Sequence, residues 1–273
     1  MPEIHPTAFV DPRASLAQGA QVRALAIVTG AVTIGEGTVV GERSHIEAGE
    51  AGTTVIGRRC VIGPGAFVGT PAQHQKADHT VGHCVLGDDV TVRECVTINR
   101  ASKPGIENAT RVGDGCFLMA CSHVGHDCVL EAEVTMANAV LLAGHVTVGR
   151  RAFLGGMAGF HQFVNVGRLA MVGGGEIATQ DVPPFAAMRY GRLKGYNAVG
   201  CRRAGVSREG VVGIRAAFLK LRRHRVMSAA LAAIRDEGLD AVPEVEELLA
   251  FIGRAKRGVV PSVGRSQSTA DDQ

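Results

Sequence analysis

The chain has 273 residues, enough for a substantial core, and its 36 glycines, 2 tyrosines and absence of tryptophan are unusual for an aromatic-packed globule. Its net charge of +3 is too weak to predict a nucleic-acid partner. Residues 1–10 lack the features of a signal peptide, no apolar run predicts an integral membrane segment, and seven cysteines without paired spacing favour a reducing cytoplasm.

Apolar residues recur at every sixth position along the first two thirds of the chain. A helix repeats near 3.6 residues and a simple strand at 2, so neither explains a period of six. One run comprises Ile4, Val10, Leu16, Val22, Val28, Ile34, Val40 and Ile46, and another comprises Val112, Leu118, Val124, Leu130, Met136, Leu142, Val148, Leu154, Phe160, Val166 and Val172. The period predicts an all-β solenoid, a parallel β-helix with three hexapeptides to each triangular coil.

The fifth residue of each hexad is small, so a large and a small side chain are expected to point inward together. Two polar segments break the phase, at residues 69–79 and 99–111, and we expect them to leave the solenoid as loops. They are either binding loops or tolerated surface insertions.

The hexad pattern stops at Pro183-Pro184, after which the sequence predicts helices. Ser207 is positioned to cap a helix through 213–221, a second is expected at 228–237, and Pro243 opens a third through 252. The predicted organisation is a β-helix over 1–184, an α-helical C-terminal domain over 185–260, and a disordered tail over 261–273.

The segment 121–128, CSHVGHDC, brackets two histidines with two cysteines. Four cysteines of the chain take the inward small position, where cysteine behaves as a small hydrophobe: Cys60, Cys84, Cys116 and Cys128. Because an inward Cys128 cannot converge with the histidines on one ion, the pattern argues against a metal site.

Three histidines, His126, His145 and His161, lie in hexads that begin one full coil apart, a coil being three hexads. They are therefore expected on one face in successive layers about 4.8 Å apart, with His123 at the corner leading into that face. Either they are scattered surface histidines, or one is a general base for a hydroxyl, with a backbone N–H such as that of Gly144 stabilising an oxyanion. No outward serine or cysteine nucleophile lies beside them, which favours direct group transfer.

Several stretches resemble the acyl-carrier-protein–UDP-N-acetylglucosamine O-acyltransferase family, which begins lipid A synthesis. They are 92–100 (VRECVTINR), 123–128 (HVGHDC), 142–146 (LAGHV), 155–163 (GGMAGFHQF), 171–174 (MVGG) and 180–185 (QDVPPF). The resemblance covers most of residues 1–260. It implies a left-handed coil and a homotrimer with active sites in clefts between neighbouring coils. It also implies acyl-carrier protein, which brings its own phosphopantetheine, as donor, with no further cofactor, and a UDP-sugar as acceptor.

The resemblance also implies residue roles. His126 would deprotonate the sugar 3-hydroxyl, Asp127 would hold its ring, the N–H of Gly144 would serve the oxyanion, and Gly174 would limit the acyl length. The substrate-binding residues would be His74, Lys76, His123, His145, His161, Gln162, Asn197 and Arg203.

Three positions depart from the family pattern. His74 stands where the acceptor loop usually has aspartate, Val199 replaces an acidic residue, and Ala204 replaces an arginine. They leave open whether the acceptor is UDP-GlcNAc, a 3-amino analogue acylated on nitrogen, or another nucleotide sugar, and whether the chain is a paralogue. Two alternatives from other classes are a zinc enzyme resembling γ-carbonic anhydrases and a non-catalytic scaffold.

Overall fold

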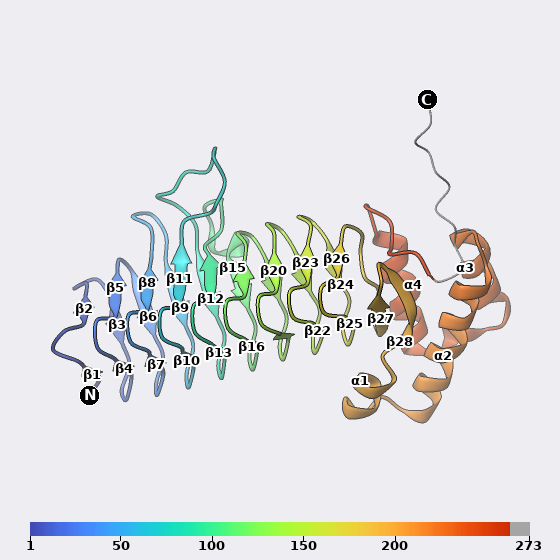
Figure 1. Cartoon of the computed structure of the whole chain (residues 1–273), viewed down its shortest axis with the longest axis horizontal. Coiled ribbons are helices and arrows are strands. Elements are labelled where there is room, and N and C mark those ends of the chain that lie inside the picture. The colour runs from blue at the N-terminus through green and yellow to red at the C-terminus, as the bar shows by residue number, and fades with distance from the viewer. Residues whose placement is uncertain (263–273) are drawn as a thin grey trace.

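The computed structural model of the chain describes residues 1–262. Figure 1 shows a long stack of coils that runs from the N-terminus to a group of helices near the other end. From residue 263 onward the expected tail lies outside the described residues.

The coils form three parallel sheets, one on each face of a triangular prism. The first sheet contains, in spatial order, β1 (Glu3–Ile4), β4 (Gln21–Val22), β7 (Val39–Val40), β10 (Val61–Ile62), β13 (Thr91–Val92), β16 (Phe117–Leu118), β19 (Thr135–Met136), β22 (Phe153–Leu154), β25 (Met171–Val172), β27 (Ala186–Arg189) and β28 (Arg192–Tyr196). The second contains β2 (Phe9–Val10), β5 (Ile27–Thr29), β8 (His45–Glu47), β11 (Phe67–Thr70), β14 (Thr97–Asn99), β17 (His123–Val124), β20 (Leu141–Leu142), β23 (Gly159–Phe160) and β26 (Ile177–Ala178). The third contains β3 (Ser15–Leu16), β6 (Val32–Ile34), β9 (Thr54–Ile56), β12 (Cys84–Leu86), β15 (Thr110–Val112), β18 (Val129–Leu130), β21 (Thr147–Val148) and β24 (Asn165–Val166). The predicted parallel β-helix is confirmed.

The core is the column of inward residues that the hexads predict. All eleven apolar positions from Val112 to Val172 are buried, as are the four inward cysteines. Burial raises the pKa of the Cys128 thiol to about 12, so this thiol is a packing group. The first coil is the exception, since Ile4 is 48% exposed and Val10 and Leu16 are only partly buried, because no earlier coil covers them.

The corners of the prism repeat as regularly as its core. A non-glycine residue with positive φ recurs at the same place in successive hexads, and examples are Asp127 (60°), His145 (62°) and Phe163 (67°). These three residues are each one coil apart, and β17, β20 and β23 pair in register with the same offset. Corner residues one coil apart therefore lie above one another, which places side chains of successive coils in contact.

The two polar segments leave the coil as expected. The first loop (residues 71–83) separates β11 from β12 and rises above the coils in Figure 1. The second loop (residues 100–109) separates β14 from β15 and contains the short helix η1 (Ile106–Asn108). Both loops leave at the corner between the second and third sheets, where CSHVGHDC lies two coils after the first loop and one coil after the second.

The helices follow the last coils. They are α1 (Ala198–Arg203), α2 (Arg208–Arg223), α3 (Met227–Asp236), η2 (Leu239–Ala241) and α4 (Pro243–Arg254). Ser207 caps α2 by accepting a hydrogen bond from the Gly210 N–H, as predicted. The hairpin of β27 and β28 comes first and continues the first sheet, so the segment expected to be helical from residue 185 becomes helical at Ala198. Within residues 1–262 no helix is both long and apolar enough to cross a membrane.

Candidate active site

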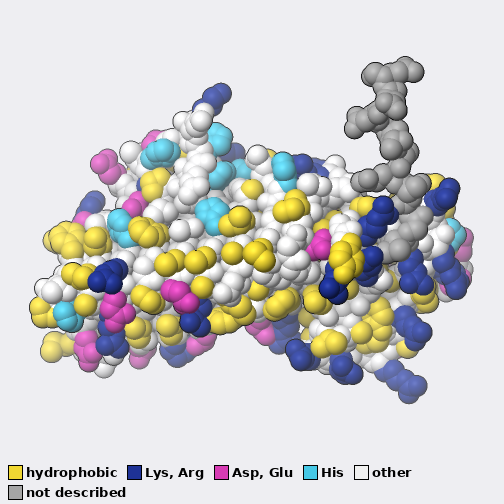
Figure 2. All heavy atoms as spheres, viewed as in Figure 1, with side chains coloured by type: hydrophobic (Ala, Val, Ile, Leu, Met, Phe, Trp, Pro, Cys, Tyr) yellow, Lys and Arg dark blue, Asp and Glu magenta, His cyan; other side chains and the backbone are white. Residues whose placement is uncertain are grey.

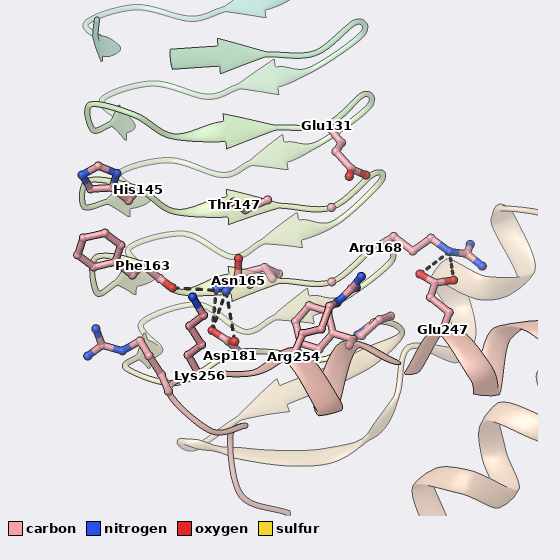
Figure 3. Close-up of a pocket in the computed structure, with 16 residues that line it drawn as sticks. Glu131, His145, Thr147, Phe163, Asn165, Arg168, Asp181, Glu247, Arg254 and Lys256 are labelled. Carbon is pink, nitrogen blue, oxygen red and sulfur yellow. Dashed lines mark hydrogen bonds and ion pairs between the residues drawn. The ribbon is translucent and has the colours of Figure 1, made fainter. Parts of the chain in front are cut away.

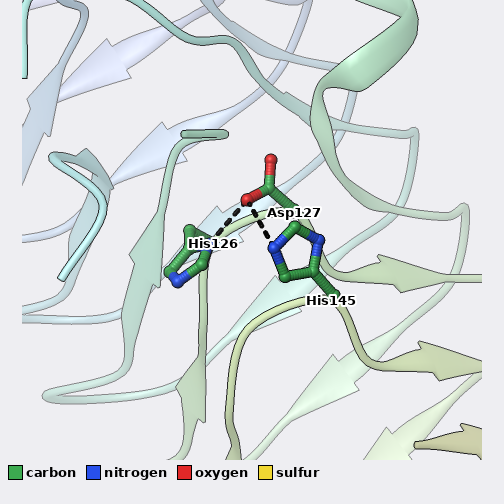
Figure 4. Close-up of side chains that lie close together, drawn as sticks. All are labelled: His126, Asp127 and His145. Carbon is green, nitrogen blue, oxygen red and sulfur yellow. Dashed lines mark hydrogen bonds and ion pairs between the residues drawn. The ribbon is translucent and has the colours of Figure 1, made fainter. Parts of the chain in front are cut away.

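A chain of hydrogen bonds fixes His126 at the corner that follows β17. The Nδ1 atom of His126 lies 2.6 Å from Oδ2 of Asp127. Ser102 of the second loop donates to the same carboxylate twice, from its backbone N–H to Oδ1 at 3.0 Å and from its hydroxyl to Oδ2 at 2.7 Å. The Asp127 N–H in turn donates to the Thr110 hydroxyl oxygen. Figure 4 shows the carboxylate between two imidazole rings.

These contacts determine which nitrogen of His126 is available. Burial opposes ionisation of Asp127, but the hydrogen bonds from His126 and Ser102 outweigh it and hold the pKa of Asp127 below its usual value. An ionised carboxylate only accepts hydrogen bonds, so Nδ1 of His126 carries the proton. In the neutral ring Nε2 then has a free lone pair, as a general base requires.

Gly144 makes room for the His126 ring. A Cβ atom at position 144 would lie 2.5 Å from Cε1 and 2.7 Å from Nε2 of His126. The ring therefore lies against the backbone of the next coil. Within the part of the chain that the structure describes, the Gly144 N–H has no protein acceptor, so it remains available as a donor beside the ring.

His145 lies directly beyond Asp127 in the next coil. Its ring stacks on Phe163, with centroids 4.5 Å apart, and stands edge-on to His126 at 5.2 Å. Its Nε2 lies 3.5 Å from Oδ2 of Asp127. Burial, the largest influence, lowers the pKa of His145 despite the attraction of the carboxylate.

His161 lies at the same corner in the following coil, directly after β23, but its ring does not join this group. The residue that continues the column below His145 is Phe163, while His161 is exposed and its Nδ1 lies 3.2 Å from the Gln162 carbonyl oxygen. The hexads start one coil apart, but the three histidines occupy different positions within them, so only His126 and His145 bring their rings together.

His123 lies on strand β17 and not at the corner where we expected it. Its Nδ1 is 2.7 Å from the Thr97 hydroxyl oxygen on the neighbouring strand. Burial, followed by the proximity of His126, lowers the pKa of His123. The side chain therefore borders the site from the face of the second sheet.

The first loop brings His74 to the site. The His74 and His126 rings meet edge-on with centroids 5.9 Å apart. Lys76 follows on the exposed part of the loop, and its N–H donates to Nδ1 of His74. Figure 2 shows histidines gathered around the base of this protruding loop.

A cavity of about 750 Å³ extends from the histidines toward the helices. Figure 3 shows it running from His145 and Phe163 past the Asn165–Asp181 pair to α4. Polar groups that line this cavity are paired with one another: the Asn165 N–H donates to Asp181, and Nε of Arg168 donates to Glu247. At its edge Arg257 donates to the Gln162 carbonyl oxygen at 3.0 Å, which places Gln162 beside the C-terminal segment.

The predicted residues of the cap lie in a different groove. Asn197, Val199, Arg203 and Ala204 together line a cavity of about 840 Å³ over β19, β22 and β25 of the first sheet. The His126 corner joins the second and third sheets, so the first sheet is the opposite face of the prism. Asn197 also caps α1, because its Oδ1 accepts from the Gly200 N–H and its Nδ2 donates to the Leu169 carbonyl oxygen. One chain does not bring these residues to His126.

Gly174 lies in the solenoid, one coil beyond Gly156. A Cβ atom at position 174 would lie 3.2 Å from the Gly156 carbonyl oxygen. A side chain here would therefore press on the backbone of the preceding coil.

The one group of potential metal ligands within residues 1–262 is His126, Asp127 and His145, whose ligand atoms lie within 4.8 Å of one another. The carboxylate oxygen between the rings already accepts from Ser102 and His126. The zinc alternative rested on three histidines on neighbouring coils, and within one chain only His126 and His145 of the three bring their rings together.

Sequence reasoning missed Ser102 and Phe163. Phe163 was detectable, because it lies one coil after His145 at the same position of its hexad. Ser102 lies in a loop, where the repeat gives no indication of its contacts.

Comparison with known proteins bears on the whole chain. A family model described as UDP N-acetylglucosamine O-acyltransferase, domain 2, matches residues 181–260. The acyl-[acyl-carrier-protein]–UDP-N-acetylglucosamine O-acyltransferase of Agrobacterium fabrum is 35% identical over 269 residues and 97% of each chain. The chain belongs to the UDP-N-acetylglucosamine O-acyltransferase family. The family member of Thermodesulfovibrio yellowstonii is 38% identical over 95% of this chain and 99% of its own.

Solved structures of the family extend this similarity to the fold. The UDP-N-acetylglucosamine acyltransferase of Campylobacter jejuni aligns with a TM-score of 0.84 at 30% identity, covering 95% of this chain and 99% of its own. That of Francisella novicida aligns with a TM-score of 0.88 at 27% identity, covering 99% of both. The family's shared architecture therefore includes both the coils and the helical cap.

Proposed function

We propose that this chain transfers an acyl group from acyl-carrier protein to the 3-position of UDP-N-acetylglucosamine, the first step of lipid A synthesis. The observation that carries the proposal is the Ser102–Asp127–His126 hydrogen-bond chain, which leaves Nε2 of His126 as the acceptor of a proton. The relatives supply the substrates of the proposal, since both are named acyl-[acyl-carrier-protein]–UDP-N-acetylglucosamine O-acyltransferases. A cytoplasmic setting belongs to the proposal and agrees with seven free cysteines.

The reaction needs one base and one oxyanion donor. Nε2 of His126 takes the proton of the sugar 3-hydroxyl as its oxygen attacks the thioester carbonyl carbon. The Gly144 N–H donates to the oxyanion that forms there. The C–S bond then breaks, and the leaving thiolate takes the proton from His126, which gives the ester and the free thiol of acyl-carrier protein. The phosphopantetheine arrives on the donor, so the protein itself requires no cofactor.

Around this centre the proposed substrate contacts come from three elements. His74 and Lys76 of the first loop approach from above, and His123 from β17. His145, which lines the cavity, and the residues His161 and Gln162 of the next coil would contact substrate as well, and Gly174 would limit the acyl chain.

A homotrimer would complete the site. Exposed large apolar side chains lie on strands of two of the three faces: Val61, Phe153 and Met171 on the first sheet, and Phe9, Ile27, Phe67, Leu141 and Ile177 on the second. Within the described residues no strand of the third sheet carries one. A first face packed on a second face of the next copy is a head-to-tail contact that closes into a ring. It would bring Asn197 and Arg203 of one copy toward His126 of another.

The acceptor is the least constrained part of the proposal. His74, Val199 and Ala204 depart from the family pattern; His74 lies against His126, whereas Val199 and Ala204 line the groove over the first sheet. A 3-amino sugar would need less help from a base than a hydroxyl, because an unprotonated amine is already a nucleophile. Removing His126 should therefore lower turnover less with a 3-amino sugar as acceptor than with a 3-hydroxyl sugar.

The test combines purified protein with acyl-acyl-carrier protein and either UDP-N-acetylglucosamine or its 3-amino analogue. Because a general base contributes about 10²–10⁴-fold, His126→Ala should lower kcat by that factor with the fold intact by circular dichroism. His5→Ala, at the far end of the solenoid, is the control and should behave as the parent. Absence of turnover by the parent with either sugar would refute the activity, and undiminished turnover by His126→Ala would refute the assigned base.

A further inference from the structure

Arg100 is a buried arginine outside the catalytic group. It is the first residue of the second loop and only 2% exposed. Burying a guanidinium costs free energy unless its donors are satisfied. The partners of Arg100 therefore indicate what the residue is for.

The partners lie at the two ends of the first loop. Nη1 donates to the Gly69 carbonyl oxygen at 2.7 Å, just before the loop begins. Nε donates to the Val81 carbonyl oxygen at 3.1 Å, and Nη2 donates to that of His79, where the loop returns. One planar guanidinium thus joins the outgoing and returning strands of the loop.

Two further contacts hold the guanidinium in place. Nη1 also donates to Oε1 of Glu47 on β8 at 2.9 Å, which compensates the buried charge. The Arg100 N–H donates to the Thr70 carbonyl oxygen, and Nδ2 of the adjacent Asn99 donates to the Thr70 hydroxyl oxygen. Arg100 therefore ties both ends of the first loop to the solenoid, alongside contacts at the returning end such as the Ala51 N–H to the Thr80 carbonyl oxygen and the Thr53 N–H to Nδ1 of His83.

The anchored loop reaches the reaction centre. It carries Lys76 and His74, and the His74 ring lies edge-on to His126. Within the described residues the Arg100 side chain makes no hydrogen bond or ion pair with His126, Asp127 or Ser102, so we expect it to act on the reaction through the first loop.

We propose that Arg100 is a positioning residue for the acceptor. Its guanidinium fixes the base of the first loop so that His74 and Lys76 lie over His126, and it thereby sets the affinity for the nucleotide sugar. This inference rests on the proposed function for its kinetic part, whereas its structural part concerns the loop alone.

The main variant is Arg100→Gln, with Arg58→Gln as a matched control that removes an exposed arginine paired with Asp88. Loss of a charge-assisted hydrogen bond corresponds to about tenfold in an equilibrium, so KM for the UDP-sugar should rise at least about tenfold. We expect kcat and KM for acyl-acyl-carrier protein to change by less than about threefold, because the Ser102–Asp127–His126 chain is untouched. Arg58→Gln should leave all three constants at parental values.

Hydrogen exchange of residues 71–83 in the substrate-free protein gives a readout that does not depend on turnover. Opening of the loop should be at least about tenfold more frequent in Arg100→Gln, while exchange of the coils stays unchanged. Arg100→Lys keeps the charge but cannot span both loop ends, so its exchange and its KM should be intermediate. It serves as the test if Arg100→Gln does not fold.

A double-mutant cycle decides whether the effect passes through the loop. In a His74→Ala/Lys76→Ala background, Arg100→Gln should raise KM by less than about twofold. An unchanged loop exchange, a loss of kcat with KM preserved, or a lower melting temperature with parental kinetics would each overturn the inference. If the parent turns over no UDP-sugar, the proposed function fails, and loop exchange still judges Arg100.

Discussion

Substituting Gly144 by alanine should displace the His126 ring without straining the backbone. The new Cβ would lie 2.5 Å from Cε1 of His126, and an ordinary contact needs at least 3.4 Å. The ring must move by most of an ångström, although its Nδ1 is held 2.6 Å from Asp127. A misplacement of about 1 Å costs on the order of 10²-fold in rate. We therefore expect kcat to fall about 100-fold, or about 2.7 kcal/mol in activation free energy.

The assay compares kcat of the variant with that of Gly253→Ala, which adds the same methyl group where nothing lies within 4 Å. The control should keep parental kcat. Overpacking costs about 1–3 kcal/mol in stability, so both proteins should remain folded at the assay temperature and circular dichroism should verify it.

The His126→Ala background separates two possible roles of Gly144. If the methyl group acts by displacing the ring, Gly144→Ala should add little once the ring has gone. A parental kcat in the single variant would refute the geometric argument. An undiminished 100-fold loss in the double variant would show that the substitution acts on the Gly144 N–H and not on His126.

Three further predictions test the fold and its electrostatics. Burial lowers the pKa of His123 in the folded chain below its ordinary 6.5, so the unfolded chain binds more protons and stability should fall as pH drops below about 6.5. The urea midpoint of His123→Gln should therefore depend less steeply on pH than that of the parent. An equal pH dependence in the two proteins would contradict this. Leu118→Ala should reduce the free energy of unfolding by about 2–5 kcal/mol. Leu25→Ala, at a half-exposed corner, should reduce it by no more than about 0.5 kcal/mol. Equal losses in the two variants would contradict the assignment of inward and outward positions in the hexads. A thiol reagent should modify only Cys95 and Cys121 of the seven cysteines in the native protein, because the other five are buried, and a third rapidly reacting thiol would contradict the inward assignment.

The solenoid was predictable because a single geometric rule places every residue in it. A coil of three hexads buries the same two positions of each hexad, so apolar and small residues recur with a period that sequence alone reveals. Ile4 fits the pattern yet remains exposed, because burial depends on a neighbouring coil that the first coil lacks on one side. The helices followed from ordinary signals such as the Ser207 cap and Pro243.

The site was predictable only where it follows the same rule. His126 and Asp127 take corner positions, and the offset of one coil places His145 beyond Asp127 and Phe163 beyond His145. Comparing hexad starts places His161 at the same corner of the next coil, but the position within the hexad decides that Phe163, and not His161, contacts His145. Ser102 could not be placed at all, because loop residues reach the site through a path that no periodicity describes.

The second loop contacts both the corner residues that the repeat places and the first loop, which the repeat does not place. Ser102 orients Asp127 and so acts on the proton-transfer group, whereas Arg100, just before it in the same loop, holds the loop that carries His74. His126, the proposed base, lies at a corner of the coil, where Gly144→Ala would bring the new Cβ within 2.5 Å of a ring atom. The His74 side chain lies on an exposed loop, so substituting it with another residue disturbs no core packing. Acceptor preference can therefore change through position 74 while the proton-transfer geometry stays fixed, and this is the pattern of departures from the family that the chain shows in its first loop.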